Sequence, residues 1–227
     1  MQEIRAWYPL ESSPEVFTSM ARAWGLPERY SFVDVLGLDP ELLSLVPRPV
    51  HAIVLLFPDT PDIVKRRTEE GPCAPVEPGD EPLWIPQVGV GHSCGTFAMI
   101  HAFAQLGLAP KLDHFFAACR ATTAPERTRL FAECDLIRDA HNGSVTAGQT
   151  VLRDTDWDDA DHFLSFVQVE VDGETRLFEL DGNAPRTGPL DRGRSTDLLQ
   201  DTAGVIRDTY LPGAGDSVHF SVMALVG

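Results

Sequence analysis

The residues Gly89-Val90-Gly91-His92-Ser93-Cys94-Gly95-Thr96 lead directly into Phe97-Ala98-Met99-Ile100-His101-Ala102. The first stretch has the glycine-rich, polar composition of a loop, and the second has the apolar pattern of a buried helix. The sequence therefore predicts a helix over residues 94–106 that begins at Cys94. A thiol in the first turn of a helix lies beside unpaired backbone N–H groups and the positive end of the helix dipole, which both stabilise a thiolate. This placement makes Cys94 a candidate nucleophile.

A histidine and an aspartate follow in the order that a thiol hydrolase needs. His162 lies 68 residues after Cys94, and Asp181 lies 19 residues after His162. The sequence Asp172-Gly173 between two β-patterned segments predicts a hairpin with a two-residue turn, and this register places Asp181 diagonally across from His162 on one face. We therefore expect the Asp181 carboxylate to orient the His162 imidazole. A turn longer by one residue would put the two side chains on opposite faces.

Each of these three residues also has an ordinary structural explanation. His162 alone fits an exposed histidine at a strand end, Asp181 alone fits a turn residue, and Cys94 alone fits a small hydrophobic residue in the core. Their joint occurrence favours catalysis over the three separate explanations. Cys119 and Cys134 lie in helical patterns with apolar neighbours, so we expect both to be packed thiols.

Gln87, seven residues before Cys94, is the candidate for a further catalytic role. An amide side chain at this position can donate a hydrogen bond to an oxyanion, together with the backbone N–H of Cys94. The alternative is an ordinary loop glutamine. We expect Ser93 to be the N-cap of the helix and His101 to be a packed or surface residue.

Composition limits the classes of function that fit this chain. With 227 residues, 43% of them hydrophobic, and no internal repeat, we expect a single domain over residues 1–227. The formal charge of −16 argues against a nucleic-acid partner and favours a basic one, although solubility alone also explains it. The longest apolar run, Ala52 to Phe57, is too short to span a membrane, and Met1 to Arg5 does not fit a signal peptide. We therefore expect a cytoplasmic or nuclear protein that does not associate with membranes.

The cysteines carry no sign of a disulfide framework or a metal site. They lie at positions 73, 94, 119 and 134 and include no C-x-x-C pair. Without a secretory signal, such cysteines are better interpreted as reduced thiols. We therefore expect neither zinc nor an organic cofactor.

Hydrophobic periodicity and turn residues predict the other elements. The sequence predicts further helices over 14–24, 112–120, 125–140 and 195–210, and strands over 32–36, 50–57, 163–171, 176–180 and 218–226. The strand over 50–57 is predicted to be buried on both faces. Residues 142–161 have little periodicity and several aspartates, which predicts a long loop that ends beside His162. This loop is either a lid over the site or an insertion without a function.

Several stretches of the chain resemble one known family. The most specific are Gly91-His92-Ser93-Cys94-Gly95-Thr96, with Ile100-His101-Ala102, and Leu177-Phe178-Glu179-Leu180-Asp181-Gly182. With the stretches over 9–16, 32–38 and 55–58, they resemble the short, single-domain members of the ubiquitin carboxyl-terminal hydrolase family of papain-like cysteine proteases. The similarity extends over nearly the whole chain.

The resemblance implies a fold, a set of roles and a substrate. The implied fold is that of a papain-like cysteine protease, an α/β (α+β) chain with a central, mostly antiparallel sheet flanked by helices on both sides. Cys94 is implied as nucleophile, His162 as base and acid, Asp181 as orienting carboxylate and Gln87 as oxyanion donor. Residues 142–161 are implied as a crossover loop that admits only slender leaving groups. The implied reaction releases small adducts or short peptides from the C-terminal glycine of ubiquitin, or of a relative such as Nedd8, without a cofactor.

This chain differs from the family pattern in three ways. The family has Asn where this chain has His92, and its glutamine lies six residues before the cysteine, whereas Gln87 lies seven before. The segment from His162 to Asp181 is four residues longer, which preserves side-chain parity because each arm gains two. These departures leave two alternatives open: a ubiquitin-binding module that has lost turnover, and a papain-like peptidase or acyltransferase with an unrelated substrate. Because no coiled-coil pattern or apolar stripe is evident, we expect a monomer.

Overall fold

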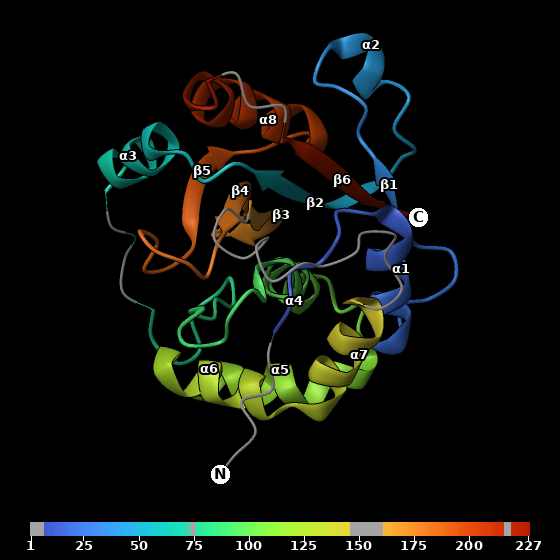
Figure 1. Cartoon of the computed structure of the whole chain (residues 1–227), viewed down its shortest axis with the longest axis vertical. Helices are drawn as coiled ribbons and strands as arrows, with labels where there is room; N and C mark the ends of the chain where they lie inside the picture. The colour runs from blue at the N-terminus through green and yellow to red at the C-terminus, as the bar shows by residue number, and fades with distance from the viewer. Residues whose placement is uncertain (1–6, 72, 74–75, 146–160, 216–218) are drawn as a thin grey trace.

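The computed structural model describes residues 7–71, 73, 76–145, 161–215 and 219–227. At its centre lies a six-stranded sheet with strand order β1-β6-β2-β3-β4-β5, in which each neighbouring pair is antiparallel (Figure 1). This confirms the predicted antiparallel sheet. The strands are β1 (Ser31–Asp34), β2 (Val50–Phe57), β3 (His162–Val171), β4 (Glu174–Leu180), β5 (Leu190–Arg194) and β6 (Ser221–Val226).

Helices lie on both faces of this sheet, as predicted (Figure 1). The α-helices are α1 (Pro14–Ala23), α2 (Pro40–Leu43), α3 (Pro61–Glu69), α4 (Cys94–Leu106), α5 (Asp113–Arg120), α6 (Ala124–Glu133), α7 (Asp135–Val145) and α8 (Leu198–Val205). Shorter helical turns are Pro110–Leu112, Ile206–Tyr210 and Leu211–Gly213. Within the described ranges, no helix combines the length and the apolar character needed to pass through a bilayer.

The alternation of side chains along β2 divides the core into two parts. Ala52 and Val54 pack in a cluster with α1, α4, α5, α6 and α7, whereas Ile53, Leu55 and Phe57 pack in a cluster with α3 and α8. Successive side chains of a strand point to opposite faces, so an unbroken apolar strand needs cover on both. The burial of β2 on both faces confirms the prediction made for residues 50–57.

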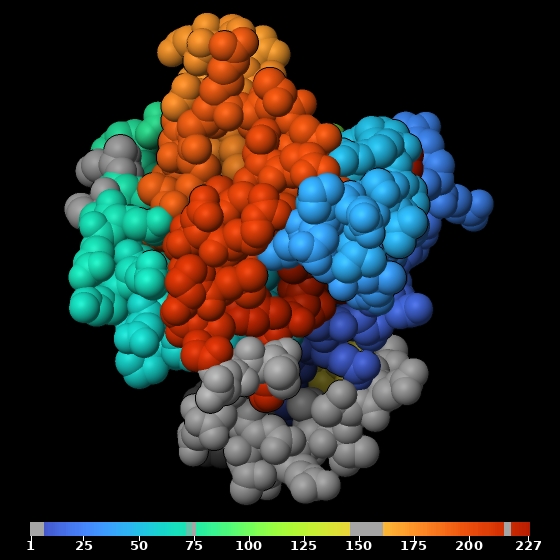
Figure 2. All heavy atoms as spheres, turned by 90° about the horizontal axis from the view of Figure 1, so that it is seen from above, coloured from blue at the N-terminus to red at the C-terminus, as the bar shows by residue number. Residues whose placement is uncertain are grey.

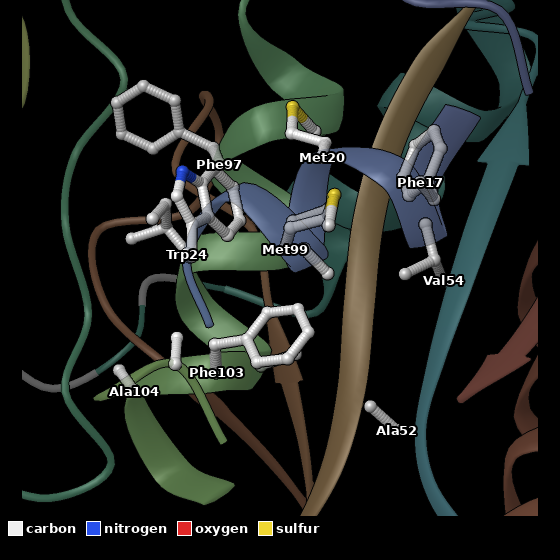
Figure 3. Packing of buried hydrophobic residues seen from close by; sticks show 14 of the residues in the cluster. Phe17, Met20, Trp24, Ala52, Val54, Phe97, Met99, Phe103 and Ala104 are labelled. Atoms are coloured by element: carbon white, nitrogen blue, oxygen red, sulfur yellow. The ribbon is translucent and has the colours of Figure 1, made fainter. Parts of the chain in front are cut away.

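The larger cluster holds α4 firmly between α1 and the sheet. Figure 3 shows Met20 of α1 and the C-cap residue Trp24 next to Phe97, Met99 and Phe103 of α4. All five side chains are at most 1% exposed, and the rings of Trp24 and Phe103 meet edge to face with centroids 6.0 Å apart. Complete burial of one large apolar side chain stabilises the fold by roughly 1.5–3 kcal/mol. This packing therefore fixes the position of the first turn of α4.

The β3–β4 hairpin has the register that its sequence predicts. Asp172 and Gly173 form a two-residue turn with φ of 52° and 79°, positive values that suit Asp-Gly in a type I′ turn. Val171 pairs with Glu174, and the ladder continues in step to the last pair before Asp181. The tip of the hairpin projects from the body of the molecule, in light orange in Figure 2.

The first helix also begins and ends as predicted. The hydroxyl of Ser13 accepts a hydrogen bond from the N–H of Val16, and Pro14 takes the first helical position. Gly25 adopts φ of 98° just after the helix, and its N–H donates to the carbonyl of Arg22. A left-handed residue at this position is the usual end of a helix, and glycine adopts it without strain.

Four predicted boundaries need correction. The predicted helix over 125–140 is two helices, because Cys134 leaves the helical region with ψ of 102°, and α7 continues to Val145 into the predicted long loop. Residues 146–160 of that loop lie outside the described residues. The predicted helix over 195–210 is α8 followed by a π-helical turn, and the last strand begins at Ser221, whereas Val218 is not among the described residues.

Three elements were not predicted, namely α2, α3 and β5. Helix α3 matters most for the site. Its buried side chains are those of Ile63 and Arg67, so its inward face carries a charged residue and its apolar periodicity is faint.

Candidate active site

Helix α4 presents Cys94 as its first residue, as predicted. The side chain packs partly against the larger core and remains half-buried. Ser93 occupies the N-cap position, but its hydroxyl donates to the carbonyl of Val90 at 2.9 Å and makes no capping hydrogen bond to the helix. A Cβ added to Gly95 would lie 3.2 Å from Leu10 and 3.3 Å from Phe163. The glycine after Cys94 therefore lets the start of α4 come close to β3.

His162 is the first residue of β3, where it pairs with Phe57 of β2. Its side chain is buried, so the alternative of an exposed strand-end histidine is wrong. Its Nε2 lies 2.8 Å from Oδ1 of Asp181, and the Cys94 side chain is near enough to the imidazole to contribute to its raised pKa. The predicted diagonal contact across the hairpin is therefore present, and the three side chains form one continuous chain of contacts.

Asp181 directly follows β4 and is held by four groups. Besides His162, Oδ1 accepts a hydrogen bond from the backbone N–H of Asn183 at 2.8 Å, the contact expected of a turn-forming aspartate. Oδ2 forms an ion pair with Arg67, and the backbone carbonyl accepts a hydrogen bond from Nε1 of Trp84 at 2.7 Å. Because both carboxylate oxygens are engaged, the side chain is held toward the imidazole.

The electrostatics of this group favour a charged pair of His162 and Asp181. Burial alone would raise the pKa of Asp181, but His162, Arg67 and the Asn183 N–H stabilise the anion and lower the pKa to about 2. Burial alone would lower the pKa of His162, but the Asp181 carboxylate and the Cys94 side chain outweigh it and raise the pKa well above its usual value. The imidazole is therefore held protonated between the Cys94 side chain and the Asp181 carboxylate.

Arg67, which sequence reasoning missed, is the buried charge that supports Asp181 from behind. Its side chain is 1% exposed, and the guanidinium also stacks over the Phe57 ring at 5.4 Å. Arg186 donates to the Arg67 carbonyl at 3.0 Å and pairs with Glu179 of β4. Ion pairs thus tie α3 to the sheet beside His162. In the sequence, the only signal of Arg67 is its spacing of four residues from Ile63, which places both side chains on one face of a helix.

Gln87 lies next to the candidate site, with its side-chain donor already engaged. Its backbone N–H donates to Gly182 at 2.7 Å, and its Nε2 donates to the carbonyl of Gly91 at 3.1 Å. Residues 87–91 therefore close a small loop before Cys94. The structure brings Gln87 to both the loop before Cys94 and the turn after Asp181, but it does not show the amide directed to an oxyanion.

The other singled-out residues have structural places. His101 is 1% exposed, and its Nε2 faces the backbone of Ile85, with distances of 3.0 Å to N and 3.1 Å to O. Burial lowers the pKa of His101 to about 4 and raises that of Cys119 to about 12. Cys119 is fully buried and Cys134 packs against the core, which confirms both as packed thiols. Among the described residues, no group of three or more His, Cys, Asp or Glu side chains has the arrangement of a metal site.

Comparison with known proteins gives a consistent result. Residues 7–210 match the family model "Ubiquitin carboxyl-terminal hydrolase, family 1". The chain is 34% identical to ubiquitin carboxyl-terminal hydrolase 3 of Arabidopsis thaliana, with 97% of this chain and 94% of that protein covered. It is 33% identical to human ubiquitin carboxyl-terminal hydrolase isozyme L1, with 96% of each covered.

Among solved structures, the fold is similar to the UCH37 catalytic domain of Trichinella spiralis bound to ubiquitin vinyl methyl ester. The TM-score is 0.73 at 22% identity, and the alignment covers 97% of this chain and 95% of that one. A second structure of UCH37 bound to the same ligand has a TM-score of 0.71 at 21% identity. At these identities the likeness concerns the fold.

Proposed function

The chain belongs to the ubiquitin carboxyl-terminal hydrolase family, and from this we infer that it is a cysteine-type deubiquitinating hydrolase. The observation that carries the proposal is the contact chain from Cys94 through His162 to Asp181. Its thiol stands at a helix start, and its imidazole lies 2.8 Å from a buried carboxylate. This is the geometry of an activated thiol, a base and an orienting group.

In the proposed reaction the Cys94 thiolate attacks the carbonyl of the C-terminal glycine, and the C–N bond breaks as His162 gives its proton to the leaving amine. A thioester remains on Cys94. His162, now neutral, takes a proton from water. The water oxygen attacks the thioester carbonyl, and the C–S bond breaks to give the glycine carboxylate and the Cys94 thiolate. Asp181 holds Nε2 of the imidazole by a hydrogen bond. Nδ1 is therefore the nitrogen that exchanges protons with the thiol, the leaving amine and water.

Oxyanion stabilisation is the step for which we propose a movement. The Cys94 N–H at the helix start and Nε2 of Gln87 are the proposed donors. Nε2 of Gln87 donates one of its two hydrogens to the Gly91 carbonyl at 3.1 Å, and we propose that the amide turns from this carbonyl so that Nε2 points at the oxyanion. We propose that the one-residue longer spacing between Gln87 and Cys94 permits this internal hydrogen bond.

Ubiquitin is the proposed substrate, because the relatives that match over nearly their whole length are named for its hydrolysis. The formal charge of −16 suits the basic, flexible tail that the family resemblance implies for ubiquitin. A relative such as Nedd8 is the proposed alternative substrate. We further propose that the protein acts as a monomer in the cytoplasm or the nucleus.

An active-site-directed probe tests the proposal. Ubiquitin with a C-terminal electrophile is expected to label the wild-type protein covalently, and Cys94→Ala is expected to abolish labelling while Cys119→Ala leaves it unchanged. Tight binding without labelling would instead indicate a ubiquitin-binding module. A parallel Nedd8 probe and an unrelated peptide electrophile decide the substrate class, because preferential labelling by the unrelated peptide would contradict the proposal.

A further inference from the structure

A groove of about 770 Å³ runs beside the candidate active site, between α6 and the loops before α4 and after β4. Gln87 and Gly182 form part of its wall. Both also border the catalytic group, since Gly182 follows Asp181 and its carbonyl accepts a hydrogen bond from the Gln87 N–H at 2.7 Å. The groove therefore begins beside the two loops that flank Cys94 and Asp181, next to the bond that is cleaved in the proposed reaction.

The walls of the groove are joined to one another, so the groove exists before any ligand arrives. On one side, Thr128 of α6 donates to the carbonyl of Pro86 at 2.6 Å, and the fully buried Arg127 donates to the carbonyl of Trp84 at 2.8 Å. On the other side, Nε1 of Trp84 donates to the Asp181 carbonyl. One short segment, residues 84–87, thus fastens both walls.

The lining of the groove is mainly apolar and includes an exposed side chain. Val88 is 69% exposed at the edge of the groove, and Pro86, Val90, Ala124 and Pro125 continue the apolar surface. An exposed large apolar side chain next to a catalytic group is the kind of feature that marks a binding surface. The volume lies within the range of roughly 300–1,000 Å³ that is typical of ligand sites.

The charges of the lining decide which part of a substrate fits. The described lining residues include no aspartate or glutamate, and their two arginines already form ion pairs: Arg129 with Glu126 and Glu133, and Arg186 with Glu70 and Glu179. A basic segment finds no free carboxylate there, and an acidic one finds no free cation. The glycine on the acyl side of the scissile bond has no side chain to fill such a groove.

We propose that this groove is a leaving-group subsite, which receives a large apolar side chain from the first residue after the scissile bond. The inference rests on the proposed function and adds a specificity to it. One methylene group more or less in a closed hydrophobic pocket changes kcat/KM by roughly 10- to 200-fold. For a groove that is open on one side we expect about tenfold, near the lower limit of this range.

A series of ubiquitin fusions that differ only in the first residue after the scissile bond tests the proposal. With Leu or Phe at this position, the wild-type kcat/KM is expected to exceed that with Gly or Asp by about tenfold. Ala124→Trp, which fills the groove from the start of α6, is expected to reduce this ratio below about twofold. Ala121→Trp is the matched control, because Ala121 is exposed but does not line the groove.

A second pair of variants removes apolar surface without adding bulk. Val88→Ser is expected to reduce the Leu-to-Gly ratio about threefold, whereas Val64→Ser on α3 leaves the ratio unchanged. Equal rates of the wild-type protein with all fusions would contradict the subsite. An unchanged Leu-to-Gly ratio in both Ala124→Trp and Val88→Ser would contradict it as well. Either result would leave the proposed hydrolase activity intact. Failure of the wild-type protein to cleave any fusion would overturn the proposed function and the subsite together.

Discussion

At the scale of single residues, Arg67 supports the candidate site although it lies in none of the sequence motifs. Arg67 has its guanidinium on Oδ2 of Asp181, and both side chains are 1% exposed. A buried ion pair is costly to break because the remaining charge keeps its desolvation penalty without its partner. Arg67 is therefore a positioning residue, which acts on His162 through the carboxylate.

Replacement of Arg67 by Met should leave the buried Asp181 carboxylate with only His162 and the Asn183 N–H to stabilise its charge. We expect Arg67→Met to lower the free energy of unfolding by about 3–5 kcal/mol, as measured by urea denaturation. The neighbouring, exposed Arg66 gives the control, and Arg66→Met is expected to change stability by less than about 0.5 kcal/mol. Equal stabilities of the two variants would contradict the assigned role of Arg67.

Removal of the Asp181 charge should alter the pH profile as well as the rate. The carboxylate raises the pKa of His162, so Asp181→Asn is expected to lower that pKa and move the alkaline limit of kcat/KM to lower pH. The expected loss in kcat is about 100- to 10,000-fold, because the imidazole also loses its orienting partner. Steady-state kinetics from pH 5 to 10 measure both effects. An alkaline limit that stays in place, or moves equally in Asp139→Asn, would refute this electrostatic role.

At the scale of elements, the approach of α4 to β3 brings the thiol to the imidazole. Gly95 permits this approach, since a Cβ there would press on Leu10 and Phe163 at 3.2 and 3.3 Å. The hairpin contributes the other half by holding His162 and Asp181 on one face in a register that its turn determines.

Gly95→Ala should therefore separate the two elements, although alanine favours helices in general. We expect a loss of about 1–3 kcal/mol in stability and a decrease of tenfold or more in the rate at which iodoacetamide alkylates Cys94. Gly204→Ala on α8 is the matched control, because a Cβ there meets nothing within 4 Å. This control is expected to gain roughly 0.5–1 kcal/mol, and a similar gain in Gly95→Ala would contradict the packing argument.

At the scale of the whole molecule, two buried neutral histidines make stability depend on pH. Burial lowers the pKa of His101 and of His141 to about 4, so the folded protein excludes protons that the unfolded chain binds below pH 6.5. Stability therefore falls as the pH decreases through this range. His162 adds no slope there, because its raised pKa keeps it protonated in the folded state and the unfolded chain is also protonated.

Between pH 6.5 and 5, the free energy of unfolding is expected to fall by about 3 kcal/mol from these two histidines together. Chemical denaturation at several pH values measures this slope. The double variant His101→Gln with His141→Gln is expected to flatten the curve in this interval, even if its stability at pH 7 is lower. A wild-type curve that is flat from pH 6.5 to 5 would show that one or both histidines bind protons in the fold.

The local rules were sufficient to predict most of the framework and the placement of Cys94, His162 and Asp181. The start of α4 at Cys94, both ends of α1, the two-sided burial of β2 and the β3–β4 register are short-range properties of periodicity, capping and turn chemistry. They failed at α3, whose inward face carries Arg67, and at Cys134, where a break inside an amphipathic stretch has no glycine or proline to signal it.

By itself, the sequence determined the elements that carry Cys94, His162 and Asp181, because spacing along a helix or a hairpin fixes which side chains share a face. Only the tertiary structure decided what surrounds them. Arg67 meets Asp181 across 114 residues, and Gln87 meets Gly182 from a separate loop. The groove beside the site likewise needs α6 and two loops together. Contacts of this kind depend on the packing of whole elements, which no local pattern encodes.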